Sequence, residues 1–109
     1  MLNCVLINLA NYEKIDDIKF LLTKIDHFYN MGVAGDSTAL SIYVDLSKCI
    51  KSPKLTPYQA LVIDLYYVKG FTMDDIGAVL NITKPTVYGH IQGALKKIHR
   101  MLMEGDYGY

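Results

Sequence analysis

Three threonines constrain the fold of the second half of this chain more than any other feature. Thr56, Thr72 and Thr83 each stand just before an apolar segment, where a side-chain hydroxyl can accept a hydrogen bond from the free N–H groups at a helix start. Gln59 and Asp75 each lie three residues after a threonine, so they can complete the reciprocal hydrogen bonds of a capping box. We therefore expect helices to begin near residues 56, 72 and 83.

The ends of these helices are also marked. The first should stop near Gly70, because glycine readily adopts the left-handed conformation that caps a helix C-terminus. Asn81, one of the few non-glycine residues that tolerate a positive φ, stands between the second and third helices. The third helix should run through residue 102, because a buried apolar stripe continues that far: Val87, Ile91, Ala94, Leu95, Ile98 and Leu102.

Two short helices joined by residues 81–83 match the demands of a helix-turn-helix. Gly77 supports this interpretation, since the following helix is expected to cross close to its backbone and a larger residue would push the two helices apart. Apolar side chains are available to fix the angle between the helices, namely Ile76, Leu80, Ile82 and Val87. We predict a helix-turn-helix domain of three to four helices over residues 53–109.

The first half of the chain predicts a pair of helices over residues 1–52. The first should extend from about Tyr12 to Asn30, closed by Gly32 and followed by a loop over residues 32–35. Its apolar positions are spaced alternately by three and four residues: Ile15, Ile18, Leu22, Ile25 and Tyr29, widened by Leu21 and Phe28.

The second helix should begin after Asp36, Ser37 and Thr38, which are good N-cap residues, and end near Lys51. Residues 52–54 then break the pattern, because a proline and the residue before it both disfavour helix. The chain is thus expected to be all-α, with about five helices and one shared core. The stripe of Ile15, Ile18, Leu22 and Ile25 either packs on the second helix or forms the seam of a homodimer.

Composition excludes several function classes. The chain has 51% hydrophobic and 20% charged residues, a balance typical of a globular protein. It has no apolar run long enough to span a bilayer and no basic flank of a signal peptide, and Cys4 and Cys49 lack the spacing of a zinc site or disulfide framework. We expect a cytoplasmic protein with no membrane association. His90 lacks a partner for metal binding or base catalysis, so we predict no catalytic residue, metal or cofactor.

The formal net charge is zero, but positive charge is concentrated near the C-terminus. Between residues 81 and 103 the chain carries basic side chains without an acidic one: Lys84, Lys96, Lys97 and Arg100. Such a cluster is typical of a nucleic-acid-binding surface, although basic residues also favour the last turns of a helix for reasons unrelated to binding.

Residues 55–102 resemble region 4 of bacterial sigma factors and the related LuxR-type output domains. The resemblance rests on five motifs: Leu55-Thr56-Pro57, Gly70-Phe71-Thr72, Asp74-Asp75-Ile76, Ile82-Thr83 and Thr86-Val87-Tyr88-Gly89-His90-Ile91. The layout, with two helices ahead of such a module, is also similar to small phage-encoded sigma-like transcription regulators.

This resemblance implies a regulator that binds double-stranded DNA sequence-specifically, with the recognition helix entering the major groove from Lys84. Lys84, Thr86, Tyr88 and Gln92 would reach base edges or nearby phosphates, and the basic residues further along would contact phosphate. The expected DNA-binding residues are Lys84, Pro85, Thr86, Tyr88, Gly89, Gln92, Lys96, Lys97 and Arg100.

The sequence departs from the family at Gly89, where related proteins commonly have a long polar or basic residue. Gly93 removes a second side chain from the same face one turn later, and each glycine weakens the helix by roughly 1 kcal/mol relative to alanine. An alternative function is therefore a protein-interaction module that keeps the region 4 fold but binds RNA polymerase or another regulator.

Overall fold

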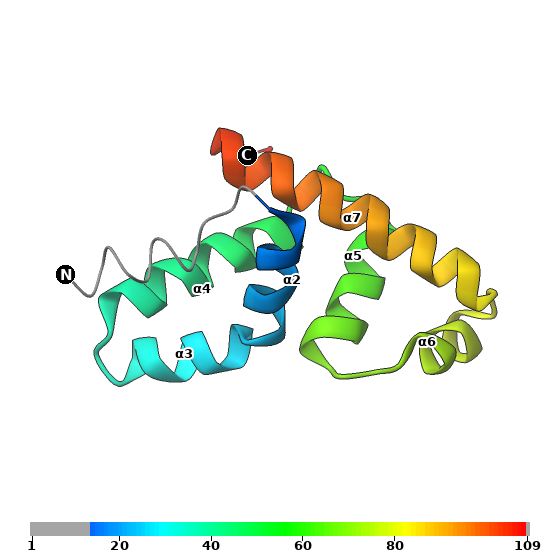
Figure 1. Ribbon diagram of the computed structural model, residues 1–109, viewed down its shortest axis with the longest axis horizontal. Coiled ribbons are helices and arrows are strands. Elements are labelled where there is room, and N and C mark those ends of the chain that lie inside the picture. Colours follow the sequence, from blue (N-terminus) through cyan, green and yellow to red (C-terminus); the bar gives the residue numbers. More distant parts are fainter. Residues whose placement is uncertain (1–13, 109) are drawn as a thin grey trace.

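The computed structural model describes residues 14–108, and the regular secondary structure in that range is helical. Figure 1 shows two groups of helices that are bridged by the long C-terminal helix α7. In chain order the elements are α2 (Ile15–Thr23), α3 (Ile25–Val33), α4 (Ser37–Ile50), α5 (Pro57–Ile63), the π-helical turn η1 (Asp64–Val68), α6 (Met73–Leu80) and α7 (Lys84–Glu104). The all-α prediction is confirmed, but the number and bounds of the helices differ from those expected.

The first predicted helix is in fact two helices, α2 and α3. Lys24 interrupts it with φ −104° and ψ 14°, and the Thr23 hydroxyl donates to the carbonyl oxygens of Lys19 (2.7 Å) and Phe20 (2.8 Å). The prediction missed this break because the apolar spacing of three and four residues continues through it. The predicted start at Tyr12 lies outside the described residues.

The end of this segment also differs from the prediction. Helix α3 continues to Val33, and Gly32 lies inside it instead of closing it. The absence of a side chain there lets α4 approach, since a Cβ atom at residue 32 would lie 2.9 Å from the Cβ atom of Leu40. The connection is therefore shorter than predicted, and α4 begins after Asp36, whose carboxylate accepts a hydrogen bond from the Ala39 N–H (3.0 Å).

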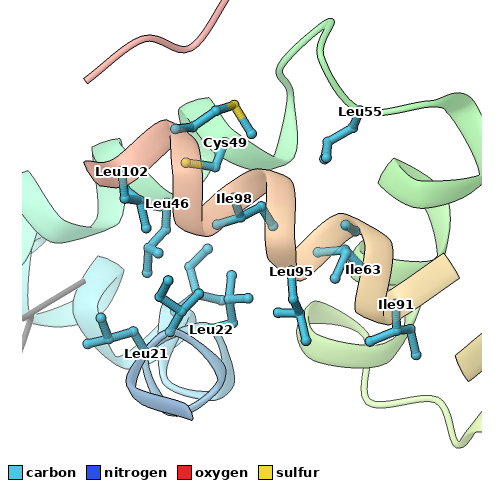
Figure 2. Close-up of a cluster of buried hydrophobic side chains, with 14 of the residues drawn as sticks. Leu21, Leu22, Leu46, Cys49, Leu55, Ile63, Ile91, Leu95, Ile98 and Leu102 are labelled. Carbon is cyan, nitrogen blue, oxygen red and sulfur yellow. The ribbon is translucent and has the colours of Figure 1, made fainter. Parts of the chain in front are cut away.

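Both halves of the chain contribute to one hydrophobic core, which is arranged around α7. Helix α7 packs against α6 through its first turns, against α5 near its middle, and against α2 and α4 further along. Figure 2 shows buried side chains of α7 together with those that surround it from α2, α4, α5 and the linker between α4 and α5. They are Ile91, Leu95, Ile98 and Leu102 from α7, Leu21 and Leu22 from α2, Leu46 and Cys49 from α4, Ile63 from α5, and Leu55 from the linker.

The predicted stripe of the first half is part of this core. Ile18 and Leu22 are fully buried within the single chain, Ile25 is nearly so and Ile15 is half-buried. These side chains are buried inside the single chain, which favours intramolecular packing over a homodimer seam. Only α3 packs mainly on the predicted partner α4, whereas α2 packs mainly on α7 and η1. Tyr29, which was expected in the same stripe, is instead exposed.

The chain widens into a π-helical turn after α5. The N–H of Lys69 donates to the carbonyl oxygen of Asp64 (2.9 Å), five residues earlier, and Gly70 then ends the segment with φ 78°. The predicted stop near Gly70 is confirmed, whereas the π-helical turn was not anticipated. Over the described residues, no helix combines the length and the apolar character needed to cross a membrane.

Candidate nucleic-acid interface

The turn between α6 and α7 is built as the sequence predicted. Asn81 adopts the left-handed conformation, with φ 58° and ψ 46°, and Thr83 caps α7 by accepting a hydrogen bond from the Thr86 N–H (3.3 Å). At the start of α6, Thr72 and Asp75 form the expected capping box, with distances of 3.0 and 3.3 Å. These local hydrogen bonds fix both ends of the turn and hence the direction in which α7 leaves it.

Gly77 is required by this turn, although for a reason that differs from the predicted one. A Cβ atom at residue 77 would lie 2.7 Å from the carbonyl oxygen of Ile82, whereas the nearest atom of α7, Cγ2 of Val87, would be 3.8 Å away. The Ile82 N–H also donates to the Gly77 carbonyl oxygen (3.0 Å). The turn backbone, not the crossing helix, therefore makes the close approach to α6.

Helix α7 presents the nine predicted DNA-binding residues at its surface. Gln92 and Lys97 are half-buried, and the other seven are exposed: Lys84, Pro85, Thr86, Tyr88, Gly89, Lys96 and Arg100. The opposite stripe of the helix is buried, and every residue predicted for that stripe is in the core. The first turns of α7 are thus supported from behind by α6 and open to solvent in front.

Two side chains in the first turns of α7, Lys84 and Thr86, already contact other residues of the chain. The Lys84 ammonium lies 3.7 Å from a carboxylate oxygen of Asp74, at the start of α6. Both side chains are largely exposed, so this pair contributes little to stability, but it offsets part of the positive charge there. The Thr86 hydroxyl lies 2.7 Å from that of Thr83 and is therefore engaged in the helix cap.

His90 has a structural partner that sequence analysis did not identify. Its ring stacks on that of Tyr58 at the start of α5, with ring centroids 5.3 Å apart and planes inclined by 26°. This contact joins α5 to α7 beside the exposed turns. No signal in the sequence could have paired the two rings, because they belong to helices far apart along the chain.

A shallow groove lies alongside the C-terminal half of α7, between that helix, the start of α5 and the linker before it. Its volume is about 500 Å³, and we call it the basic groove. It is lined by Lys54, Gln59, Gly93, Lys96, Lys97, Arg100 and Met101. Three of these residues were predicted to bind DNA, whereas Lys54 and Gln59 were not, since only the tertiary structure brings them beside α7.

An acidic side chain borders the basic groove at Lys54. The Lys54 ammonium lies 3.0 Å from a carboxylate oxygen of Asp106, in the segment that follows α7. The hydrogen bond from Lys54 and a second one from the Gly108 N–H (3.1 Å) hold the pKa of the Asp106 carboxyl below its usual value. Asp106 is therefore ionised at neutral pH, and it would compete with an anionic ligand for the Lys54 ammonium.

Comparison with known proteins agrees with this geometry. Residues 53–98 match the family described as sigma-70, region 4, over a little under half of the chain. Searches of curated proteins and of solved structures found no match. The matched segment contains α5, η1, α6, the turn at Asn81 and most of α7. Residues 53–98 are therefore a helix-turn-helix of the sigma-70 region 4 type.

Proposed function

We propose that this protein is a transcription regulator that binds double-stranded DNA sequence-specifically, with the first turns of α7 in the major groove. The observation that carries the proposal is the sigma-70 region 4 match over residues 53–98. The exposure of the first turns of α7, from Lys84 to Gln92, supports it, because a recognition helix must present its N-terminal residues to the base edges.

Different parts of α7 would make different contacts. Lys84, Tyr88 and Gln92 have side chains long enough to reach base edges. Gly89 has no side chain, and the space beside it is open, since a Cβ atom there would meet nothing within 4 Å. Gly89 would therefore allow the helix backbone to approach the DNA closely but would read no base itself. Because few side chains read bases, sequence preference should be modest for one copy of the protein.

Salt dependence of binding tests this proposal. If Lys84, Lys96, Lys97 and Arg100 each neutralise one phosphate, the logarithm of affinity should fall against the logarithm of salt concentration with a slope of roughly −3 to −4. Lys96→Gln should flatten the slope by about one on every duplex, whereas Gln92→Ala should weaken binding more on the preferred sequence than on random DNA.

Lys19→Gln is a suitable control for these variants. Lys19 lies on α2, outside the helix-turn-helix segment, and its ammonium pairs with the carboxylate of Asp16 on the same helix (3.7 Å). The DNA-binding proposal fails if the wild-type protein shows no salt-sensitive binding to duplex DNA at low salt, or if a variant lacking all four basic side chains binds like the Lys19→Gln control.

A second candidate function is binding to RNA polymerase or another regulator. It is favoured by the exposed apolar side chains on the helix-turn-helix segment, where Leu61, Val79 and Tyr88 have exposed fractions of 40%, 62% and 53%. The Lys84–Asp74 pair also lowers the positive charge of the first turns. Under this alternative, Val79→Ser should weaken binding to purified RNA polymerase without DNA, and Lys96→Gln should leave it unchanged.

A further inference from the structure

The basic groove has the features of a site for a single anionic group. It is formed by three separate segments: the linker before α5 through Lys54, α5 through Gln59, and α7 through the remaining residues. All of its long polar side chains can donate hydrogen bonds to an anion. We propose that the basic groove binds one phosphate of the DNA backbone, beside the helix that reads the bases, and this inference rests on the function proposed above.

The orientation of Gln59 is the first argument. Its Oε1 atom accepts a hydrogen bond from the Thr56 N–H (3.0 Å), and its own backbone N–H donates to Thr56 Oγ1 (3.1 Å). Because the capping box holds Oε1, the Nε2 group points toward α7. It lies 2.9 Å from the position that a Cβ atom would take at residue 93. Gly93 thus leaves room for a fixed amide donor that faces the groove.

The second argument is the absence of compensating charge. Within residues 14–108, no carboxylate forms an ion pair with Lys96, Lys97 or Arg100. Arg100 can donate two parallel hydrogen bonds to the phosphate in the groove, whereas Lys96 and Lys97 add charge for neighbouring phosphates of the same strand without requiring a particular geometry. Lys54 is the exception in the groove, since it pairs with Asp106.

The position of the groove along α7 identifies the phosphate. Lys96 is ten residues beyond Thr86, which corresponds to about 15 Å along a helix axis. The major groove is about 12 Å wide. If the first turns of α7 enter the major groove and the helix leaves it at an angle, α7 passes a bordering strand near Gly93 and Lys96. The basic groove opens there, so a phosphate of that strand is the occupant we infer.

The Lys54–Asp106 ion pair allows a test in which two substitutions should change DNA affinity in opposite directions. Lys54→Gln removes a positive charge from the groove and should weaken DNA binding roughly tenfold, with a slope of affinity against salt that is flatter by about 0.9. Asp106→Asn removes the same ion pair but releases Lys54, so it should strengthen DNA binding. If the Lys54–Asp106 pair served only to stabilise the fold, both variants would change binding in the same direction.

Gly93→Ala tests the amide donor while leaving every charge in place. The added Cβ atom would displace Gln59 Nε2, the far end of a flexible side chain, and should weaken binding several-fold without changing the salt slope. Binding should be measured on a duplex and on a series of duplexes in which one phosphate at a time is an uncharged methylphosphonate. At one position, the methylphosphonate should weaken DNA binding by the wild-type protein but not by Lys54→Gln. Circular dichroism should show that each variant is folded.

The outcomes separate this inference from the proposed function. The phosphate site is refuted and the DNA-binding proposal stands if Lys84→Ala weakens DNA binding but three variants behave like Lys19→Gln. These three variants are Lys54→Gln, Asp106→Asn and Gly93→Ala. The same conclusion follows if no single methylphosphonate distinguishes the wild type from Lys54→Gln. If the wild type shows no salt-sensitive binding to any duplex, the proposed function itself is refuted, and the phosphate site with it.

Discussion

Gly77 and Gly89 offer a matched pair of substitutions that measures the constraint at the helix-turn-helix. Both are helical glycines, in α6 and α7, so alanine should gain about 1 kcal/mol of helix propensity at either position. Their surroundings differ. A Cβ atom at residue 89 would meet nothing within 4 Å, whereas one at residue 77 would lie 2.7 Å from the Ile82 carbonyl oxygen.

The Ile82 carbonyl cannot easily move away from such a Cβ atom. It lies between Asn81, which is held in the left-handed conformation, and Thr83, which caps α7. Overpacking of this kind costs about 1–3 kcal/mol. Because the propensity gain is common to both variants, the difference between Gly77→Ala and Gly89→Ala should equal that cost.

Thermal unfolding followed by circular dichroism measures this difference. Gly89→Ala should raise Tm by about 4 °C, and Gly77→Ala should melt at least about 4 °C below it, because 1 kcal/mol corresponds to about 4 °C for a chain of this size. Gly77→Leu should lower Tm further and abolish DNA binding. If both alanine variants raise Tm equally, the turn backbone does not constrain Gly77 and our account of this contact is wrong.

Three further predictions concern the fold. Leu22→Ala should destabilise the protein by about 2–5 kcal/mol, because Leu22 is fully buried, and sedimentation of the wild type should detect a monomer if the packing alternative is right. Asn81→Val should cost at least about 1–2 kcal/mol in urea unfolding, whereas Asn81→Gly should be tolerated, because Asn81 has φ 58°. Burial, reinforced by the nearby Asp45 carboxylate, raises the pKa of the Cys49 thiol from 9.0 to about 12. The unfolded chain therefore loses this proton first as pH rises, so the free energy of unfolding should decrease between pH 9 and 12, and by less in Cys49→Ala.

The sequence alone determined the features that depend on neighbours within a few residues. The caps at Thr72 and Thr83, the positive φ at Asn81 and the stop at Gly70 were all predicted correctly. Each depends on a hydrogen bond or a backbone preference inside a single turn of chain, so the residue types suffice to identify it. The buried stripe of α7 was predicted for the same reason, because helical periodicity is also a local property.

The tertiary structure decided the features that depend on residues distant in sequence. The break at Lys24 is invisible to periodicity, because the apolar spacing continues across it and both resulting helices bury the same stripe. Likewise, burial of Leu22 against α7 could not be distinguished from burial against a second copy, since the same apolar spacing serves both.

The basic groove shows this limit most clearly. Sequence analysis found Lys96 and Arg100, which lie on one face of α7, but it did not find Lys54 or Gln59. Those two residues reach the groove only because α5 packs against α7, through contacts between side chains that lie some thirty residues or more apart in the chain. Local patterns specify which helices form and which faces they bury, whereas the packing of those faces determines which polar side chains meet at the surface.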